Sequence, residues 1–355
     1  MSLSCLEIEQ FRCIEKAHIE FAADANLIIG KNASGKTSLL EAIFLMGTGH
    51  SFRTHQTDLL IRRGQSSFTT VGKLSNQQGL EVVGIRGNAD SKDIRVNGQT
   101  AKSLAELALR LPVQVIDPEI HRLLEDGPNR RRRFIDWGVF HVEHRFHDAW
   151  RRYQRALRQR NAALRSKQSP NVFRVWDQEL VEQGELVANL RDTYLDSLLP
   201  YINQLGQRLL GCSIEAEHQR GWKRQLSLEA AMAEGVARDQ LRGTTCNGPH
   251  RADVVFKLAN VSAKDRISRG QQKMLACVLI LAQQLHRVAT GAVPACLLLD
   301  DPAAELDVDN LGKLLEIVTT LPAQLVVTSL SGEVREFFPQ AKMFHVEHGK
   351  VQAMA

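Results

Sequence analysis

The sequence LIIGKNASGKTSLLEAI, residues 27–43, joins an apolar run, a glycine-rich loop and the start of an apolar helix. Eight of its residues match the spacing G-x-x-x-x-G-K-[ST] of a Walker A loop: Gly30, Lys31, Asn32, Ala33, Ser34, Gly35, Lys36 and Thr37. In such a loop backbone N–H groups surround phosphate oxygens, the lysine reaches the β- and γ-phosphates, and the threonine binds Mg²⁺. We therefore predict a nucleotide site here, with Lys36 as a catalytic residue and Thr37 as a Mg²⁺ ligand.

A second motif, ACLLLDD at residues 295–301, is an apolar run that ends on two carboxylates. At the end of a buried strand beside a phosphate loop, Asp300 can hold Mg²⁺ and Asp301 can polarise the attacking water. The alternative is that the pair only caps the following segment. The order and spacing of the two motifs favour hydrolysis of ATP or GTP.

The third motif is ISRGQQKMLACVLILAQQL, residues 267–285, in which polar residues precede an apolar helix. Ser268 and the backbone around Gly270 would present donors at a helix N-terminus, which is a second anion site. One nucleotide does not need two such sites in one chain. We predict that Ser268 of one protomer contacts the γ-phosphate bound to the Walker A loop of another, which gives a head-to-tail dimer. The alternative is an ordinary capped helix.

The order of segments predicts an α/β fold with an insertion. Residues 1–45 read as strand, strand, loop and helix, residues 67–98 as an antiparallel meander, and ACLLL and QLVVTSL as strands buried on both faces of a parallel sheet. Between them, helical periodicity resumes on both sides of the break KQSPN, which indicates a short helical hairpin. We predict a P-loop ATPase lobe with a mixed sheet at 1–110 and 245–355, and an inserted, mainly helical lobe at 111–244.

Charge is unevenly distributed along the chain. The net charge is +5, but residues 128–168 carry twelve Lys/Arg and three Asp/Glu, a local charge of +9. Such a segment indicates a polyanionic partner, and the alternative is a solvated helix face. We assign DNA backbone contacts to part of it, at Arg151, Arg155 and Arg158.

Cysteine spacing and hydropathy argue against a disulfide-bonded, zinc-binding or membrane-spanning protein. The six cysteines lie far apart without a C-x-x-C pair, which favours reduced thiols over disulfides or a zinc site. The longest apolar run, MLACVLILA at residues 274–282, is shorter than the roughly 18 residues of a membrane span. The first residues show no secretory signal pattern, so we expect a cytoplasmic protein without membrane contact.

Taken together, the motifs resemble the ABC-type ATPase heads of the SMC family, and specifically the RecF family of bacterial recombination proteins. The resemblance extends over nearly the whole chain and is carried by FRCIEKAHIEF, GKNASGKTSLLEAI, LEDGPNRRRRFIDWGVFH, GPHRADVVF, SRGQQKMLACVLILA and LLLDDPAAELD. It implies that the signature acting in trans is formed by Ser268, Gly270 and Gln271. It also implies that Glu305-Leu306-Asp307 is the D-loop, with Asp307 in a catalytic role, and that Arg12 contacts phosphate or adenine.

Two departures qualify the resemblance. Ala304 stands where related proteins often carry serine, and Thr328 and Ser329 stand where transporter ATPases carry a switch histidine. The missing histidine argues against a transporter subunit and for slow, switch-like hydrolysis. Gln114 is a candidate for the Q-loop glutamine, and for residues 248–253, GPHRAD, a structural turn and a ligand contact stay open.

The function implied by the resemblance is that of an ATP-dependent DNA-binding protein of recombinational repair, replication-fork maintenance and the SOS response. With ATP and Mg²⁺ as cofactors, it would form a homodimer, bind single-stranded and gapped duplex DNA, and help RecO and RecR to load RecA. A weak DNA-dependent ATPase activity would reset it. One rival function is an ABC transporter ATPase subunit. The other is a P-loop kinase, for which the signature in trans would have no role.

Overall fold

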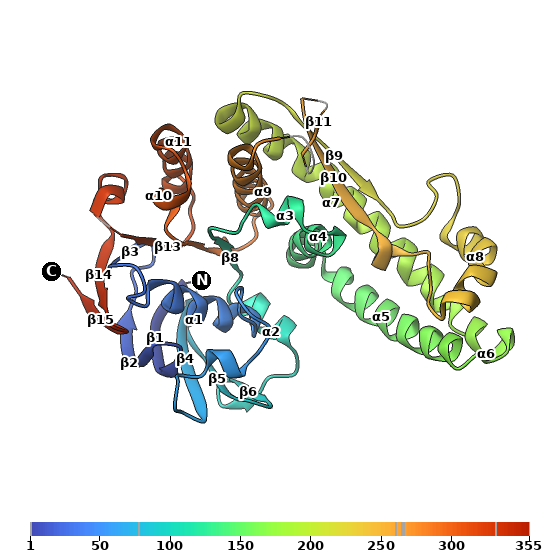
Figure 1. Ribbon diagram of the computed structural model, residues 1–355, viewed down its shortest axis with the longest axis horizontal. Helices are drawn as coiled ribbons and strands as arrows, with labels where there is room; N and C mark the ends of the chain where they lie inside the picture. The colour runs from blue at the N-terminus through green and yellow to red at the C-terminus, as the bar shows by residue number, and fades with distance from the viewer. Residues whose placement is uncertain (1, 77–78, 260, 264–266, 331, 355) are drawn as a thin grey trace. The chain divides into compact units, whose positions relative to one another are not determined.

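The computed structural model describes residues 2–76, 79–259, 261–263, 267–330 and 332–354. The chain forms two compact units, Met1–Ile120 with Arg287–Ala355, and His121–His286 (Figure 1). These boundaries differ from the expected division, because residues 111–120 fold with the first unit, where β8 (Val113–Ile116) pairs with β12 (Cys296–Leu299), and residues 245–286 fold with the helical unit. The reason is tertiary: β10 (Asp253–Leu258) pairs with β9 (Ile214–Gln219), and Gln283 of α9 (Arg269–Ala289) donates to the carbonyl of Phe134.

An antiparallel sheet opens the first unit. Its strand order is β2-β1-β4-β5-β6-β7, and the predicted meander at residues 67–98 is part of it. Alternation places one face of β1 in the core and the other outward, as its burial pattern shows. The bounds are β1 Ser2–Phe11, β2 Ile14–Glu20, β4 Ser67–Asn76, β5 Gly79–Asn88, β6 Lys92–Val96 and β7 Gln99–Thr100.

A second sheet, in the order β15-β14-β3-β13-β12-β8, carries the Walker motifs. All its pairs are parallel except β14 with β15, so the sheet is mixed, as predicted. The central strands β12 and β13 are buried at every residue, in agreement with their unbroken apolar runs. The bounds are β3 Ala25–Ile29, β8 Val113–Ile116, β12 Cys296–Leu299, β13 Leu325–Ser329, β14 Lys342–Glu347 and β15 Lys350–Ala353.

Helices complete the first unit: α1 (Lys36–Thr48), α2 (Leu104–Arg110), α10 (Pro302–Glu305) and α11 (Val308–Thr319). Helix α1 contacts strands of both sheets and is buried over most of its length. Its side chains, including Leu39, Leu40 and Ile43, share one apolar core with residues of β1, β4 and β13. This core fixes α1, and hence the loop before it, relative to the ends of the parallel strands.

The second unit is mainly helical, as predicted, and contains the hairpin of α5 and α7. A three-stranded antiparallel sheet, β11-β10-β9, accompanies the helices. The remaining bounds are α3 Arg122–Glu125, α4 Pro128–Val142, α5 His144–Arg165, α6 Pro170–Arg174, α7 Asp177–Leu210, α8 Leu228–Arg242 and β11 Val261–Ser262.

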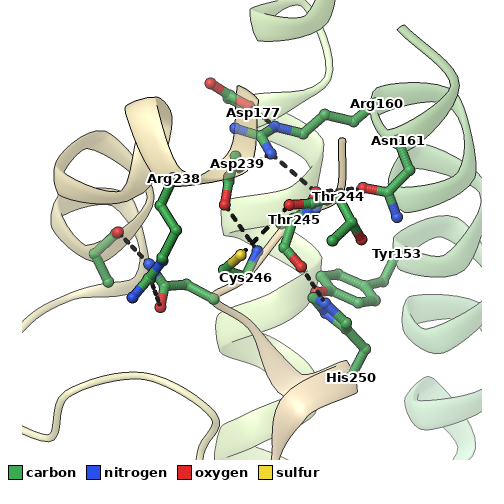
Figure 2. Close-up of polar contacts among 12 residues, drawn as sticks. Tyr153, Arg160, Asn161, Asp177, Arg238, Asp239, Thr244, Thr245, Cys246 and His250 are labelled. Atoms are coloured by element: carbon green, nitrogen blue, oxygen red, sulfur yellow. Dashed lines mark hydrogen bonds and ion pairs between the residues drawn. The ribbon is translucent and has the colours of Figure 1, made fainter. Parts of the chain in front are cut away.

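A buried arginine ties the hairpin together. Arg160 of α5 is 0% exposed, and it donates to Asp177 at 2.8 Å, to Asp239 of α8 at 2.7 Å and to the Thr245 hydroxyl at 2.9 Å. Figure 2 shows these side chains converging between α5 and α8. Because a buried charge is costly unless it is paired and hydrogen-bonded, these contacts set the packing of α5, α7 and α8.

Candidate nucleotide-binding site

The Walker A loop lies at the carboxyl end of β3, between β14 and β13. Gly30 has no room for a side chain, since a Cβ atom would lie 2.3 Å from the carbonyl oxygen of Val346. Gly35 has a φ of +119°, which glycine adopts without strain. Lys31, Asn32 and Ala33 are exposed at the rim, whereas the buried Ser34 hydroxyl has no hydrogen-bond partner in the described part of the chain. The loop is therefore shaped by its backbone, as a phosphate cradle requires.

Lys36 begins α1 and turns back over the loop. Its side chain is 4% exposed, and Nζ donates to the carbonyl oxygens of Gly30 at 2.7 Å and Lys31 at 3.2 Å. Nζ also lies 3.4 Å from Oδ2 of Asp301. Lys36 and Asp301 thus form an ion pair beside the loop, although 265 positions separate them in the sequence.

Thr37 and Asp300 meet beside this pair. The Thr37 hydroxyl donates to Oδ1 of Asp300 at 3.0 Å, so the two predicted Mg²⁺ ligands lie together. The pKa of Asp300 lies above its usual range, because burial raises it by more than the hydrogen bonds from Thr328 and Thr37 lower it. Hydroxyl and carboxylate oxygens are the donors that Mg²⁺ prefers, so this pair fits that cation.

Thr328 has a role that sequence reasoning missed. At the carboxyl end of β13, its hydroxyl donates to Oδ1 of Asp300 at 2.9 Å and accepts from the backbone N–H of Asp301 at 2.9 Å. The strand order explains this role, because β13 lies between β3 and β12. From the sequence, Thr328 is noted only as a residue in place of a histidine. In the fold it orients the Asp300 carboxylate and holds the backbone of Asp301.

Arg12 is held beside the loop by a buried carboxylate. Its guanidinium makes two hydrogen bonds to Glu41 of α1, at 2.8 and 2.7 Å, and Glu41 is 0% exposed. The Ser51 hydroxyl donates to the same carboxylate. Sequence reasoning named Arg12 but missed Glu41 and Ser51. The available signal was a glutamate within the otherwise apolar stretch LLEAIFLM.

Ser268 lies in the second unit, immediately before α9. Its hydroxyl accepts from the backbone N–H of Gln271 at 3.2 Å, and the Gln271 side chain accepts from the backbone N–H of Ser268 at 3.0 Å. This reciprocal pair is a capping box. Ser268, Gly270 and Gln271 are all exposed.

Asp307 caps another helix. At the start of α11 its carboxylate accepts from the backbone N–H of Asn310 at 2.9 Å. This hydrogen bond lowers the pKa of Asp307. Of its neighbours in the D-loop segment, Ala304 is exposed, and the side chain of Glu305 lies outside the described residues.

Gln114 is buried within β8, paired with Leu297, and β8 continues for two residues beyond it. The structure therefore does not place Gln114 at the carboxyl edge where Asp300 and Thr328 meet.

The basic segment divides into two groups of arginines. Arg131 is buried and makes two hydrogen bonds to Asp253 at 2.8 and 3.0 Å, and Arg160 is buried in the network described above. Arg151, Arg155 and Arg158 are exposed on α5, and Arg151 pairs with Asp148 at 3.2 Å. Part of the local charge of +9 is thus neutralised inside the unit, and the exposed face of α5 carries less charge than the sequence indicates.

The segment GPHRAD is held by surrounding side chains. Arg191 donates to the carbonyl of Pro249 at 2.8 Å, and Arg132 donates to that of Ala252. Nδ1 of His250 lies 2.6 Å from the Tyr153 hydroxyl and Nε2 lies 3.0 Å from the carbonyl of Thr245 (Figure 2). The carbonyl can only accept, so a neutral ring protonated at Nε2 satisfies both contacts. These contacts favour the structural turn over a ligand contact.

We expect His250 to make the stability of the second unit depend on pH. Burial lowers the pKa of His250 from 6.5 to about 4, and the nearby Arg251 and Arg132 act in the same direction. Between these pH values the unfolded chain binds a proton that the folded chain does not, so stability falls as pH falls from 6.5 to 4. We expect His250→Gln to remove up to about 3 kcal/mol of this loss, measured by urea unfolding across the window.

Other groups titrate in the same window, so the informative quantity is the difference between the two proteins. The glutamine side chain offers one acceptor and one donor, and it does not titrate. Parallel curves of unfolding free energy against pH would contradict a role for His250.

The fold and this site define an ABC-type ATPase head of the SMC class. The family model described as the RecF/RecN/SMC N terminal domain matches residues 2–352. The proteins named "DNA replication and repair protein RecF" from Thioalkalivibrio sulfidiphilus and Vibrio cholerae are 40% and 39% identical, with 99% of each chain covered in both cases. The chain belongs to the RecF family.

Solved structures agree with this assignment. The structure of the recombination mediator protein RecF-ATPrS in the RecFOR pathway is 25% identical, with a TM-score of 0.85 and coverage of 99% of this chain and 98% of that chain. An Smc head bound to the C-winged helix domain of ScpA is 16% identical, with a TM-score of 0.63 and coverage of 100% and 98%, and shares the fold. The transporter alternative is not favoured by these relatives. Within the described residues, no helix combines the length and the apolar character needed to cross a bilayer.

Proposed function

We propose that the chain is an ATP-dependent DNA-binding protein of recombinational repair and replication-fork maintenance, in which ATP joins two chains and hydrolysis releases them. The observation that supports this proposal is that the two groups of motif residues lie in different units of the chain. The first unit holds a complete set of groups for phosphate and Mg²⁺ at the ends of β3, β12 and β13. The second unit presents the capped, exposed end of α9.

Each residue has a proposed role in this cycle. The backbone of residues 30–37 binds phosphate oxygens, and Lys36 leaves the loop carbonyls for the β- and γ-phosphates. Thr37 and Asp300 would hold Mg²⁺, which would supply positive charge to the phosphates, and Asp301 would orient the attacking water. Ser268, Gly270 and Gln271 of the second chain contact the γ-phosphate, and Asp307 acts at the dimer contact.

The partners are proposed from family membership and from the printed names of relatives. These names support a role in DNA replication and repair and in the RecFOR pathway. From family membership we further propose action on single-stranded and gapped duplex DNA in the cytoplasm, with RecO and RecR as partners and RecA as the protein to be loaded. Hydrolysis is weak and DNA-dependent, and it returns the dimer to separate chains. Thr328 supports slow hydrolysis, because it places at the end of β13 a group that cannot act as a general base at neutral pH.

Binding to gapped duplex DNA, with and without ATP, tests the function. We expect tighter binding with ATP, and contacts from Arg151, Arg155 and Arg158 to the backbone. If six to ten phosphates are neutralised, affinity falls roughly 10³- to 10⁵-fold between 50 and 200 mM salt. Replacement of the three arginines by glutamate should weaken binding and flatten this dependence, as measured by fluorescence anisotropy.

A matched control reverses three other cations of the same unit, the exposed Lys223 and Arg224 and the partly exposed Lys257. It changes the net charge equally but leaves α5 intact. A flat salt dependence of the unmodified protein, or equal losses in the two triple variants, would show that this face of α5 is only solvated.

A further inference from the structure

Four potential metal ligands gather on the outward face of the first sheet, away from the Walker loop in sequence. In the register of β1 with β2, Cys5 lies opposite Glu20, and Glu7 lies opposite His18. These are successive cross-strand pairs on one face, because residues two apart along a strand point the same way. A thiol, an imidazole and two carboxylates are thus brought together by the pairing of two strands.

The distances between donor atoms are those of a compact cluster. The sulfur of Cys5 lies 3.9 Å from both ring nitrogens of His18. Nδ1 of His18 lies 3.6 Å from a carboxylate oxygen of Glu7, and Nε2 lies 3.8 Å from one of Glu20. Among the residues that the structure describes, Cys5, Glu7 and His18 form the one group of three such donors whose ligand atoms all lie within 4.8 Å of one another.

These separations are longer than those of a four-coordinate zinc site. Tetrahedral Zn²⁺ with bonds of about 2.3 Å to sulfur and about 2.0–2.1 Å to nitrogen or oxygen keeps its ligand atoms about 3.4–3.6 Å apart. The ligand atoms of Cys5, Glu7 and His18 all lie within 4.8 Å of one another, so they have to approach by at most about 1.3 Å. Glu20 lies next to the other ring nitrogen of His18, so its side chain has to turn toward the same ion. Because His18 is 56% exposed and both glutamates reach solvent, side-chain rotation can supply this contraction without moving the backbone.

The surroundings of the cluster allow a cation to enter. Glu7 and His18 line a groove of about 310 Å³ on the outer face of the sheet, and Cys5, which is 7% exposed, is not part of its lining. Lys73 of β4 lies 3.8 Å from Glu7 and competes with a metal ion for this carboxylate, so its side chain, 42% exposed, has to turn into solvent when the ion binds. Burial raises the pKa of the Cys5 thiol, so a bound cation has to displace its proton.

We propose that Cys5, Glu7, His18 and Glu20 form a zinc site that joins β1 to β2. A mixed set of thiolate, imidazole and carboxylate donors selects Zn²⁺ over Mg²⁺ and Ca²⁺, which prefer oxygen alone. This site lies outside the nucleotide chemistry and revises the expectation from sequence that the cysteines bind no metal. The expectation rested on C-x-x-C spacing, whereas here the ligands are adjacent only because antiparallel strands pair.

Cobalt titration of the full-length, reduced, nucleotide-free protein tests the proposal, since Co²⁺ reports tetrahedral thiolate ligation by absorption. We expect a thiolate-to-cobalt charge-transfer band at one equivalent, which Zn²⁺ then removes. Cys5→Ser should lose the band. His18→Gln should weaken Zn²⁺ at least about tenfold, since loss of even a group that supports a ligand costs that much.

Cys13→Ser is the matched control, because Cys13 is an exposed thiol near the same sheet and outside the cluster. It should keep the band and the affinity. Cys5 is buried, so its variant could lose stability, whereas His18 is exposed and its replacement by glutamine leaves the core untouched. Absence of the band in the unmodified protein, or unchanged zinc affinity in a folded His18→Gln variant, would overturn the proposal.

Discussion

Lys36→Ala is expected to abolish ATP-induced dimerisation while the chain remains folded. The lysine carries the positive charge nearest to the loop carbonyls, at 2.7 Å from that of Gly30, and alanine supplies none to the β- and γ-phosphates. Loss of its hydrogen bonds to Gly30 and Lys31 costs about 1–3 kcal/mol locally, which a chain of this size tolerates. Sedimentation velocity with and without ATP measures the result.

Asp301→Asn is the matched control for this variant. It changes the other member of the 3.4 Å ion pair but keeps the lysine and the Mg²⁺ ligands. We expect it to bind ATP and dimerise, and then to remain dimeric because the attacking water is no longer oriented. An unchanged ATP-induced dimer in Lys36→Ala, or a loss of ATP binding in Asp301→Asn, would contradict the proposed division of roles.

Ser268→Arg is expected to give a chain that binds ATP as a monomer and does not dimerise. Its Walker A loop, in the other unit, is intact, but the larger side chain blocks the contribution of α9 to the opposite γ-phosphate. Ser268 is exposed, so the substitution costs the capping hydrogen bond, about 1 kcal/mol, and no core packing. Equilibrium ATP binding and sedimentation together measure the two properties.

Mixing Ser268→Arg with Lys36→Ala tests action in trans. A head-to-tail pair of the two variants has one complete composite site, formed by the Walker A loop of the first and the signature of the second. We expect the mixture to recover dimers and ATPase activity from that single site. Ser268→Ala, which removes the cap without adding bulk, separates loss of the cap from the steric block. Full ATPase activity of Ser268→Arg as a monomer would exclude a shared site.

Local physics made much of the fold and site predictable. The Walker A spacing, the apolar runs of β12 and β13 and the alternation at residues 67–98 act within a few residues, so the sequence alone determined the α/β class, the phosphate loop and the Asp300–Asp301 pair. The helical hairpin followed from periodicity in the same way. The resemblance added the family, which the comparisons confirm.

Only the tertiary structure decided which distant groups meet. Thr328 joins Asp300 because β13 lies between β3 and β12, and Glu41 holds Arg12 because α1 packs against β1. The basic segment is the clearest case. Sequence gives the charge of every arginine, but Arg131 and Arg160 are neutralised by acids 122 and 79 positions away. Charge is a property of residues, whereas burial and pairing depend on which segments the packed core brings together, and no local pattern encodes that.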